Sequence, residues 1–329
     1  MRERDIRPQQ VFDEFLRLSR LDARQLAAQQ EHWRHCACPA CGAKQSLPGF
    51  SKHGFSYVTC ARCASLYADP RPTRAALAEF YRDSRAARFL TGTFYRETEQ
   101  QRRMLMFRPR ARLLAQLLRQ HGVRRITRLA DIGAGYGVFL QEMRRTRLAG
   151  SYTAIEPSLS AGAVLRDKKF KVIQAMLEAV PRNEYGRYDL LTMCELFEHL
   201  HAPAPFLRKV RRLLRPHGCL FLTTLSGAGF DIRVLGRDAR AVHPPHHLNF
   251  VTPDAMAILL RRCGFESLAI ITPGKLDTDI VANAPAAVQR RLPPFLRELL
   301  ANETARTALQ QFLVANRMSS HMVVLARRK

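Results

Sequence analysis

The segment Arg128-Leu-Ala-Asp-Ile-Gly-Ala-Gly-Tyr-Gly-Val-Phe-Leu140 decides the fold of this chain. Its apolar residues before Gly133 predict a buried strand, and those after Gly137 predict the start of a helix. Gly133, Gly135 and Gly137 let the backbone turn and leave no Cβ where a ligand would approach. Because the helix that follows offers free N–H groups in its first turn, the segment predicts a ligand site between strand and helix.

The spacing of the glycines separates this turn from a dinucleotide fingerprint. In GxGxxG the third glycine would stand at Val138, whereas this chain has it at Gly137, which argues against a nicotinamide cofactor. Nineteen residues after Gly137, a second predicted strand, Tyr152–Glu156, ends in a carboxylate. An acid at the tip of the second strand is where doubly wound folds hold ribose hydroxyls.

Short apolar runs alternate with helical patterns from Arg128 onward, which indicates a mostly parallel α/β sheet. Further strands are expected at 170–175, 188–194, 219–224 and 322–326. A helical insertion is expected before the last of them, at about 286–316.

Asp131, the three glycines and Glu156 resemble the class I S-adenosylmethionine-dependent methyltransferases, from about Arg110 to the end of the chain. The resemblance implies an α/β fold with a Rossmann-like seven-stranded sheet, and direct methyl transfer from S-adenosyl-L-methionine. It also implies that a set of residues at the ends of the strands contacts this cofactor. The set consists of Asp131, Gly133, Ala134, Gly135, Tyr136, Gly137, Glu156, Pro157, Met176, Leu177, Cys194 and Glu195.

Five of the eight cysteines lie between Cys36 and Cys63. Two CxxC pairs, Cys38 with Cys41 and Cys60 with Cys63, are separated by eighteen residues, which predicts a four-thiolate zinc ribbon. Cys36 has the wrong spacing for a pair. A closed site of four sulfurs has no open position, so the zinc is expected to be structural; four unpaired buried thiols are the alternative.

These features divide the chain into an N-terminal helical segment (1–35), the zinc ribbon (36–72), a helical connector (73–109) and the methyltransferase domain (110–329). The cysteine pairs, the run Asp69–Thr73 and the pair Phe80-Tyr81 resemble the head of a methyltransferase group that acts on nucleotide-linked sugars and other small metabolites. The resemblance implies a small or carrier-linked anionic substrate, such as a nucleotide sugar or an intermediate of polysaccharide or natural-product synthesis.

The loop after the fifth strand contains three histidines ahead of Thr252-Pro253, in the run His243-Pro-Pro-His246-His247. In the related group a Glu-His pair precedes a Thr/Ser-Pro helix start, so the resemblance makes His247 the candidate catalytic base and puts His246 where the acid usually stands. A neutral imidazole can take the proton of a hydroxyl or an activated carbon near pH 7. His199 is the second candidate base; packing of the loop is the alternative role for the pair.

The chain carries a formal net charge of +25, and 45 of its 53 basic residues are arginine. Such a charge attracts nucleic acid and anionic lipid without specificity. The segment Arg102–Arg128 holds nine arginines and no acid, which predicts either a site for phosphate, phospholipid or RNA, or a solvated helix face.

Two other functions remain open on the sequence. An RNA methyltransferase could use the ribbon to bind RNA, but base methylation usually employs an Asn/Asp-Pro-Pro-aromatic run where this chain has Cys194–Phe197. A non-catalytic S-adenosylmethionine-binding adaptor would use the ribbon to bind a partner and keep a vestigial fold, and the intact glycine turn and Glu156 argue against it.

No run of 18 uncharged apolar residues occurs, and the start MRERDIRPQQ has no apolar stretch behind it. The sequence therefore predicts neither a transmembrane helix nor a signal peptide, and favours the cytoplasm. Self-association as a homodimer stays open.

Overall fold

The computed structural model describes residues 3–329. The chain forms two compact units, each assembled from three segments. The first unit consists of Met1–Thr98, Leu225–Met256 and Ile271–Met322. The second consists of Glu99–Thr224, Ala257–Ile270 and Val323–Lys329. The predicted division of the chain after residues 35, 72 and 109 stays a prediction.

The second unit is built on a seven-stranded sheet with the order β10-β11-β8-β7-β4-β5-β6, which confirms the predicted Rossmann-like architecture. The pairs β4–β5, β4–β7, β5–β6 and β7–β8 are parallel. The strands are β4 (Ile126–Ile132), β5 (Ala149–Ile155), β6 (Lys171–Ile173), β7 (Tyr188–Cys194), β8 (Leu214–Leu225), β10 (Phe265–Ile271) and β11 (His321–Arg328).

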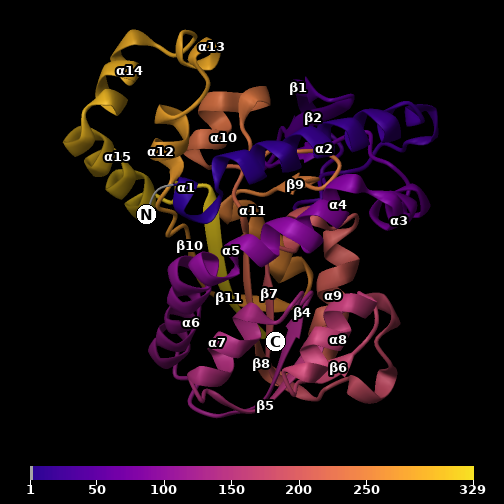
Figure 1. Ribbon diagram of the computed structural model, residues 1–329. Coiled ribbons are helices and arrows are strands. Elements are labelled where there is room, and N and C mark those ends of the chain that lie inside the picture. Colours follow the sequence, from indigo (N-terminus) through magenta and orange to yellow (C-terminus); the bar gives the residue numbers. More distant parts are fainter. Residues whose placement is uncertain (1–2) are drawn as a thin grey trace. The chain divides into compact units, whose positions relative to one another are not determined.

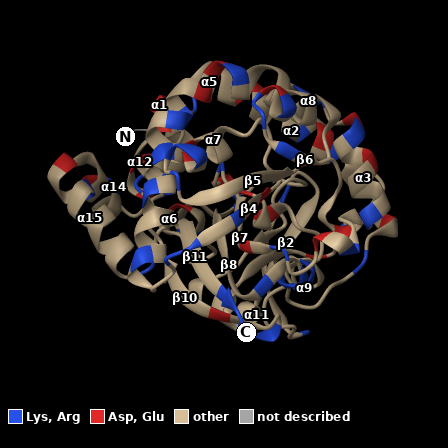
Figure 2. Cartoon of the chain, turned by 90° about the horizontal axis from the view of Figure 1, so that it is seen from below, with Lys and Arg blue, Asp and Glu red and all other residues tan. Residues whose placement is uncertain are grey.

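The inner strands of this sheet are covered on both faces, as their sequences require. Every residue of β7 from Tyr188 to Met193 is buried, so burial along the strand is continuous rather than alternating. Figures 1 and 2 show the strands of the unit between two layers of helices; in Figure 2, α6, α7 and α8 lie on one side of the sheet and α9 lies on the other. These helices are α6 (Arg108–Gln120), α7 (Val138–Arg145), α8 (Leu159–Asp167) and α9 (Pro203–Leu213).

The order of the strands reverses between β4 and β7. From β4 the chain adds β5 and β6 on one side, and then returns to add β7 and β8 on the other. In doubly wound folds a ligand binds outside the carboxyl ends of the strands at such a reversal. The glycine turn follows β4 at this point.

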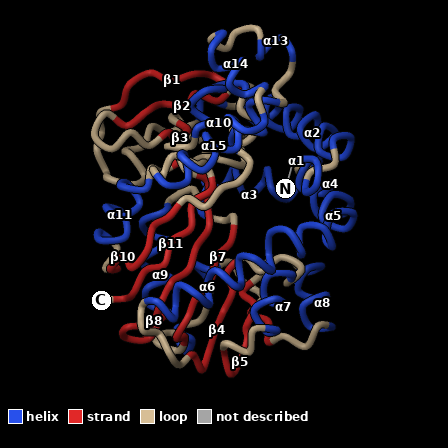
Figure 3. Tube along the Cα trace, turned by 90° about the vertical axis from the view of Figure 1, so that its left-hand side faces the viewer, coloured by secondary structure: helices blue, strands red, loops and turns tan. Residues whose placement is uncertain are grey.

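The first unit has a four-stranded sheet with the order β1-β2-β3-β9. Figure 3 shows β1 (Ser46–Lys52) and β2 (Phe55–Cys60) as a long hairpin, and β3 (Leu66–Ala68) pairs with β9 (Asn249–Phe250). Phe55 and Tyr57 alternate with more exposed residues along β2, and both are fully buried, so the segment folds as an amphipathic ribbon.

Both regions that flank the cysteine-rich segment contain helices. The N-terminal part contains α1 (Glu3–Ile6) and α2 (Gln9–Ala27); the connector contains α3 (Arg74–Asp83), α4 (Arg85–Phe89) and α5 (Tyr95–Arg102). Two segments between these helices, Leu90–Phe94 and Arg103–Phe107, are π-helical.

The remaining helices come late in the chain. They are α10 (Phe230–Leu235), α11 (Pro253–Arg262), α12 (Asp277–Ala282), α13 (Ala286–Gln289), α14 (Pro294–Ala301) and α15 (Glu303–Ala315), the last three lying in the predicted helical insertion. In the part of the chain that the structure describes, no helix is long and apolar enough to cross a membrane.

Candidate functional site

The glycine turn after β4 has the geometry that its sequence predicts. Gly133, Gly135 and Gly137 all have left-handed backbone conformations, with φ of 70°, 51° and 75°. A Cβ on Gly137 would lie 2.6 Å from Leu165 Cδ2, so that glycine is required by packing against α8. A Cβ on Gly135 would meet no atom within 4 Å. Gly135 therefore borders open space, as a glycine beside a bound ligand should.

Glu156 follows β5 and lies against the same turn. Its carboxylate accepts the N–H of Gly135 at 2.8 Å and the N–H of Ser158 at 2.9 Å, and the side chain is buried. Each carboxylate oxygen retains a lone pair after these bonds, so the group can still accept hydroxyl protons. The structure thus brings the predicted ribose-binding acid to the predicted glycine turn.

Asp131, near the end of β4, is buried beneath the turn. Its Oδ1 accepts a hydrogen bond from the Thr192 hydroxyl at 2.6 Å. Burial raises the pKa of Asp131 to about 7, and the nearby Glu156 carboxylate adds to the rise, while the bond from Thr192 opposes it. The carboxyl group is therefore protonated in part at neutral pH.

Glu195 follows β7 in a left-handed conformation, with φ of 52°. Arg110 donates to its Oε1 at 2.7 Å, and the Thr223 hydroxyl donates to the same oxygen at 2.7 Å. Arg110 is only 5% exposed. Burial disfavours the charge of Arg110, yet the carboxylate of Glu195 and its other neighbours leave the pKa of the guanidinium above its ordinary value. This buried ion pair fixes the backbone at the end of β7.

Glu198 adds a further carboxyl group three residues later. Its Oε2 accepts from the Thr224 hydroxyl at 2.8 Å, and only 1% of the residue is exposed. Burial raises the pKa of Glu198 to about 8, and the Glu195 carboxylate contributes to the rise. Four carboxyl groups, those of Asp131, Glu156, Glu195 and Glu198, therefore share this edge of the sheet with one buried guanidinium.

The other residues implied by the resemblance lie on the same loops of the second unit. Ala134 is buried within the turn, and Tyr136 is half-buried. Pro157 follows Glu156 and is exposed. Met176 is 60% exposed whereas Leu177 is buried.

Cys194, the last residue of β7, does not have the properties of a nucleophile. Desolvation raises the pKa of its thiol to about 12, so the thiolate is absent at neutral pH. The roles assigned to the cofactor set stay predictions.

The arginine-rich segment is not simply a solvated face. Arg110 is buried against Glu195, and the side chains of Arg103 and Arg108 donate to the buried carboxylate of Glu142 at 2.6 and 3.1 Å. Arg145 also contacts this carboxylate. Sequence reasoning missed Arg110 as a site residue because nothing in a run of arginines distinguishes the buried one.

The four predicted zinc ligands converge in the first unit. The Sγ atoms of Cys38, Cys41, Cys60 and Cys63 all lie within 4.8 Å of one another. The Cys38–Cys63 and Cys41–Cys60 sulfur pairs are both 3.5 Å apart. Zinc with four bonds of about 2.3 Å in a tetrahedron would separate its sulfurs by about 3.8 Å, so the cluster fits a zinc ion.

The two CxxC turns have the same backbone geometry. Gly42 donates its N–H to the carbonyl of Cys38 at 2.9 Å, and Ala64 donates to Cys60 at 3.0 Å. Both residues are left-handed, with φ of 78° and 54°. A left-handed alanine is strained, which is consistent with a turn held by a metal. The sequence indicated this geometry at Gly42 but not at Ala64.

The candidate histidines fall in different units: His199 in the second, and His246 and His247 in the first. His247 is 9% exposed, and its Nδ1 lies 2.6 Å from the carbonyl oxygen of Ala241. Because a carbonyl only accepts hydrogen bonds, Nδ1 carries a proton, and in the neutral form of the ring the lone pair is on Nε2.

His246 is packed rather than presented to solvent. Its ring lies 5.2 Å from the ring of Phe80, 5.7 Å from Tyr81 and 6.1 Å from Phe15. These contacts hold the loop in place. A catalytic base requires such a fixed position, but a loop that only packs would show the same contacts.

Comparison with known proteins agrees with this architecture. Residues 97–270, more than half of the chain, match the protein family described as "Methyltransferase domain". The chain belongs to this methyltransferase domain family. The match covers β4 to β8 and with them the glycine turn and Glu195.

Two relatives named "Ubiquinone biosynthesis O-methyltransferase" are similar to part of the chain. The protein of Xanthomonas axonopodis pv. citri is 32% identical over 152 residues, 42% of this chain and 62% of its own. That of Xanthomonas oryzae pv. oryzae strain PXO99A is 32% identical over 149 residues, covering 41% and 60%. The chain thus spans less than two thirds of these curated relatives.

A solved structure of plantazolicin methyltransferase, in complex with a monoazolic desmethyl analogue and SAH, has the same fold. It aligns with a TM-score of 0.50 and 14% identity, over 77% of this chain and 94% of its own.

Proposed function

We propose that this member of the methyltransferase domain family transfers a methyl group from S-adenosylmethionine to a small or carrier-linked metabolite. The observation that carries the proposal is the open space at Gly135 beside the carboxylate of Glu156. Glu156 and the turn would hold the ribose and the amino-acid part of the cofactor. S-Adenosylmethionine, when bound, supplies an electrophilic methyl group on a sulfonium.

The charge at this edge favours a cationic ligand. Burial leaves Asp131 partly and Glu198 mostly protonated at neutral pH, so the carboxylates of Glu156 and Glu195, with part of a charge on Asp131, exceed the one guanidinium, Arg110, that shares their surroundings. The chain as a whole has a net charge of +25, so the charge at this edge is opposite in sign to that of the chain. A sulfonium with an α-amino group is attracted there, whereas the diphosphate of a nicotinamide dinucleotide is repelled.

The test is ligand-induced stabilisation. S-Adenosylhomocysteine should raise the melting temperature of the whole chain by mass action, and NAD should not. Stabilisation by NAD with none by S-adenosylhomocysteine would overturn the proposal.

For the acceptor, we propose a hydroxyl on a (nucleotide-)sugar or on an intermediate of polysaccharide or natural-product synthesis. Oxygen is favoured over nitrogen or carbon because the relatives are named O-methyltransferases. Their name does not fix the acceptor here, since the likeness spans only 62% and 60% of them.

We further propose His247 as the base. Its Nε2 would take the hydroxyl proton while the oxygen forms the new bond to the methyl carbon and the carbon–sulfur bond breaks. The Nδ1–H bond to Ala241 fixes the tautomer that can do so. His247→Ala should leave stabilisation by S-adenosylhomocysteine intact and reduce turnover by about 10²–10⁴-fold. A wild-type rate for this variant, with a large loss for His199→Ala, would assign the role to His199.

A further inference from the structure

A polar pocket of about 440 Å³ lies in the first unit, away from the cysteine cluster. It is lined by α1, α12, the start of α15 and Arg240. Its volume falls in the range of small-molecule sites, roughly 300–1,000 Å³. Four arginines line the pocket together with three carboxylates; the arginines are Arg4, Arg7, Arg240 and Arg306.

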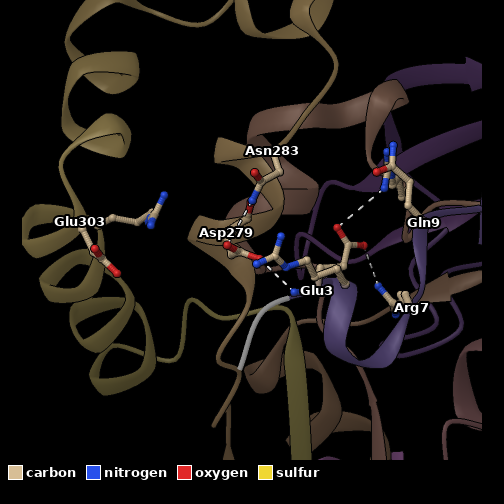
Figure 4. A pocket seen from close by; sticks show the side chains of 9 residues that line it. Glu3, Arg7, Gln9, Asp279, Asn283 and Glu303 are labelled. Carbon is tan, nitrogen blue, oxygen red and sulfur yellow. Dashed lines mark hydrogen bonds and ion pairs between the residues drawn. The ribbon is translucent and has the colours of Figure 1, made fainter. Parts of the chain in front are cut away.

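Two of these arginines share one carboxylate within the pocket. Glu3 is 8% exposed, and its carboxylate lies 3.3 Å from Arg7 Nη1 and 3.8 Å from Arg240 Nη1. Figure 4 shows Glu3 between Arg7 and Asp279. Asp279 is occupied by neutral donors, since it accepts the backbone N–H of Glu3 at 3.0 Å and the side-chain amide of Asn283 at 3.1 Å.

The other two arginines have no such partner. Within residues 3–329, no carboxylate oxygen lies within 4.0 Å of the guanidinium of Arg4 or of Arg306. Arg306 makes a long contact, 3.5 Å from Nη1 to the carbonyl of Leu300. Glu303 is exposed at the first turn of α15 and forms no ion pair in the same part of the chain. The pocket therefore presents cationic donors for an anion and a carboxylate that can accept from hydroxyls.

A series of packed side chains connects the lining of the pocket to the loop of the candidate base. The guanidinium groups of Arg7 and Arg240 lie 5.1 and 6.0 Å from the ring centre of Phe12. Phe12 stacks on Phe15 at 6.1 Å, and Phe15 meets the His243 ring at 5.5 Å.

The main chain makes a second connection. The carbonyl of Arg240 accepts from His243 Nδ1 at 3.2 Å, and the next carbonyl, that of Ala241, accepts from His247 Nδ1. A ligand that contacts Arg240 is therefore held by the same short segment that orients His247.

We propose that this pocket binds the phosphate- or diphosphate-bearing, hydroxyl-rich end of the acceptor substrate, with Arg4 and Arg306 as the phosphate ligands. The proposal rests on the proposed function, because it takes the ligand of this pocket to be the acceptor that His247 would deprotonate. The phosphate chemistry follows from the two guanidinium groups, which donate in the fork geometry that phosphate oxygens accept. The carboxylate of Glu303 and the amide of Asn283 suit sugar hydroxyls.

The test measures binding of inorganic pyrophosphate and of glucose 1-phosphate to the full chain by calorimetry in 150 mM salt. Both should bind, and glucose should not. Arg4→Gln and Arg306→Gln should each weaken binding at least about tenfold, the scale of one lost charge-assisted hydrogen bond. Arg82→Gln is the matched control, since Arg82 is an exposed arginine of the same unit on α3, and it should leave binding unchanged. Equal binding by all three variants would overturn the proposal.

A second arm separates an acceptor from an independent phosphorylated ligand. A small-molecule extract, incubated with the protein and S-adenosylmethionine carrying a labelled methyl group, should lose its methyl acceptor after treatment with phosphodiesterase and phosphatase. An acceptor that survives this treatment would overturn the assignment to the substrate. Stabilisation by S-adenosylhomocysteine should be unchanged in every arginine variant, so failure of the pocket and failure of the cofactor site give different results.

Discussion

At the scale of single residues, a comparison of Gly135 with Gly122 can show whether Gly135 is needed for ligand space or only for its backbone conformation. Gly135 and Gly122 both have left-handed φ, 51° and 70°, and a Cβ on either would meet nothing within 4 Å. Gly122 lies in the turn after α6 and is no part of the site. The two glycines therefore form a matched pair.

We expect Gly135→Val to abolish the rise in melting temperature caused by S-adenosylhomocysteine, because the branched side chain fills the space of the ligand. Gly122→Val should suffer the same backbone strain, about 1 kcal/mol, and keep the full rise. Thermal denaturation with and without the ligand measures both. A full rise in Gly135→Val would remove the turn from the cofactor site.

Asp231 predicts a pH dependence of stability in the first unit. It is 1% exposed, and burial, aided by the nearby Asp277 carboxylate, raises its pKa to about 7. The folded chain therefore holds a proton that the unfolded chain releases near pH 4, so this residue lowers the free energy of unfolding as pH rises from about 4 to about 7. Each unit by which the pKa is raised in the folded chain lowers the free energy of unfolding above pH 7 by about 1.4 kcal/mol, relative to that at low pH.

Asp231→Asn should remove that dependence. The free energy of unfolding of the variant minus that of the wild type should be higher at pH 8 than at pH 5, as measured by urea unfolding. Asp254→Asn is the control, because the Asp254 side chain is 82% exposed, and it should show no such difference. An equal loss of stability at both pH values would show that Asp231 is ionised in the folded chain.

Spacing in the sequence explains which site residues could be predicted. Gly133, Gly135 and Glu156 were found because their spacing is tied to a backbone turn and a strand end. Arg110 and Ala64 were missed. Burial of one arginine in a run, and left-handed φ at an alanine, depend on contacts with residues far along the chain.

At the scale of elements, the ribbon joins residues that are distant in sequence. Its cysteine spacing was readable, but the pairing of β3 with β9 was not, since β9 has only two residues and therefore no periodicity. Tyr57 donates its hydroxyl to the carbonyl of His247 at 2.7 Å and lies 6.1 Å from the ring of Phe250. The ribbon thus supports the loop that carries the candidate base.

Loss of one zinc ligand should therefore affect the fold. We expect the purified chain to hold one zinc ion, and Cys38→Ser to lose most of it and to melt at least about 5 °C lower. Cys36→Ser is the matched control: Cys36 lies in the same segment but outside the four-sulfur cluster, so it should keep the metal. Plasma mass spectrometry measures the zinc content of the wild type and of both variants. Full zinc in Cys38→Ser would contradict the ligand set.

At the scale of the whole molecule, the sequence predicted the sheet but not the partition of the chain. Each unit gathers three separate segments, and β8, α11 and β11 all pass from one unit to the other. Hydrophobic periodicity reports which face of an element is buried, and it does not report which distant element covers that face. The polar pocket was equally unpredictable from the sequence, because its arginines come from residues 4, 7, 240 and 306.

The net charge of +25 gives the last prediction, which concerns the RNA alternative. Figure 2 shows basic residues on helices of both units, including α3, α5 and α8. Several of the buried or partly buried arginines form ion pairs with Glu142 and Glu195. The remaining basic residues therefore give a general positive potential and not a surface that recognises an RNA sequence. We therefore expect RNA to bind through its phosphates alone.

A labelled RNA oligonucleotide should bind at low salt and lose about 10³-fold or more in affinity between about 50 and 200 mM salt, as expected when six or more phosphates are contacted. Stabilisation by S-adenosylhomocysteine should change little over the same range, since that ligand releases few counterions. No labelled methyl group should enter the RNA. Salt-resistant binding together with methyl incorporation would instead establish the RNA methyltransferase, and the polar pocket in the first unit would then need another ligand.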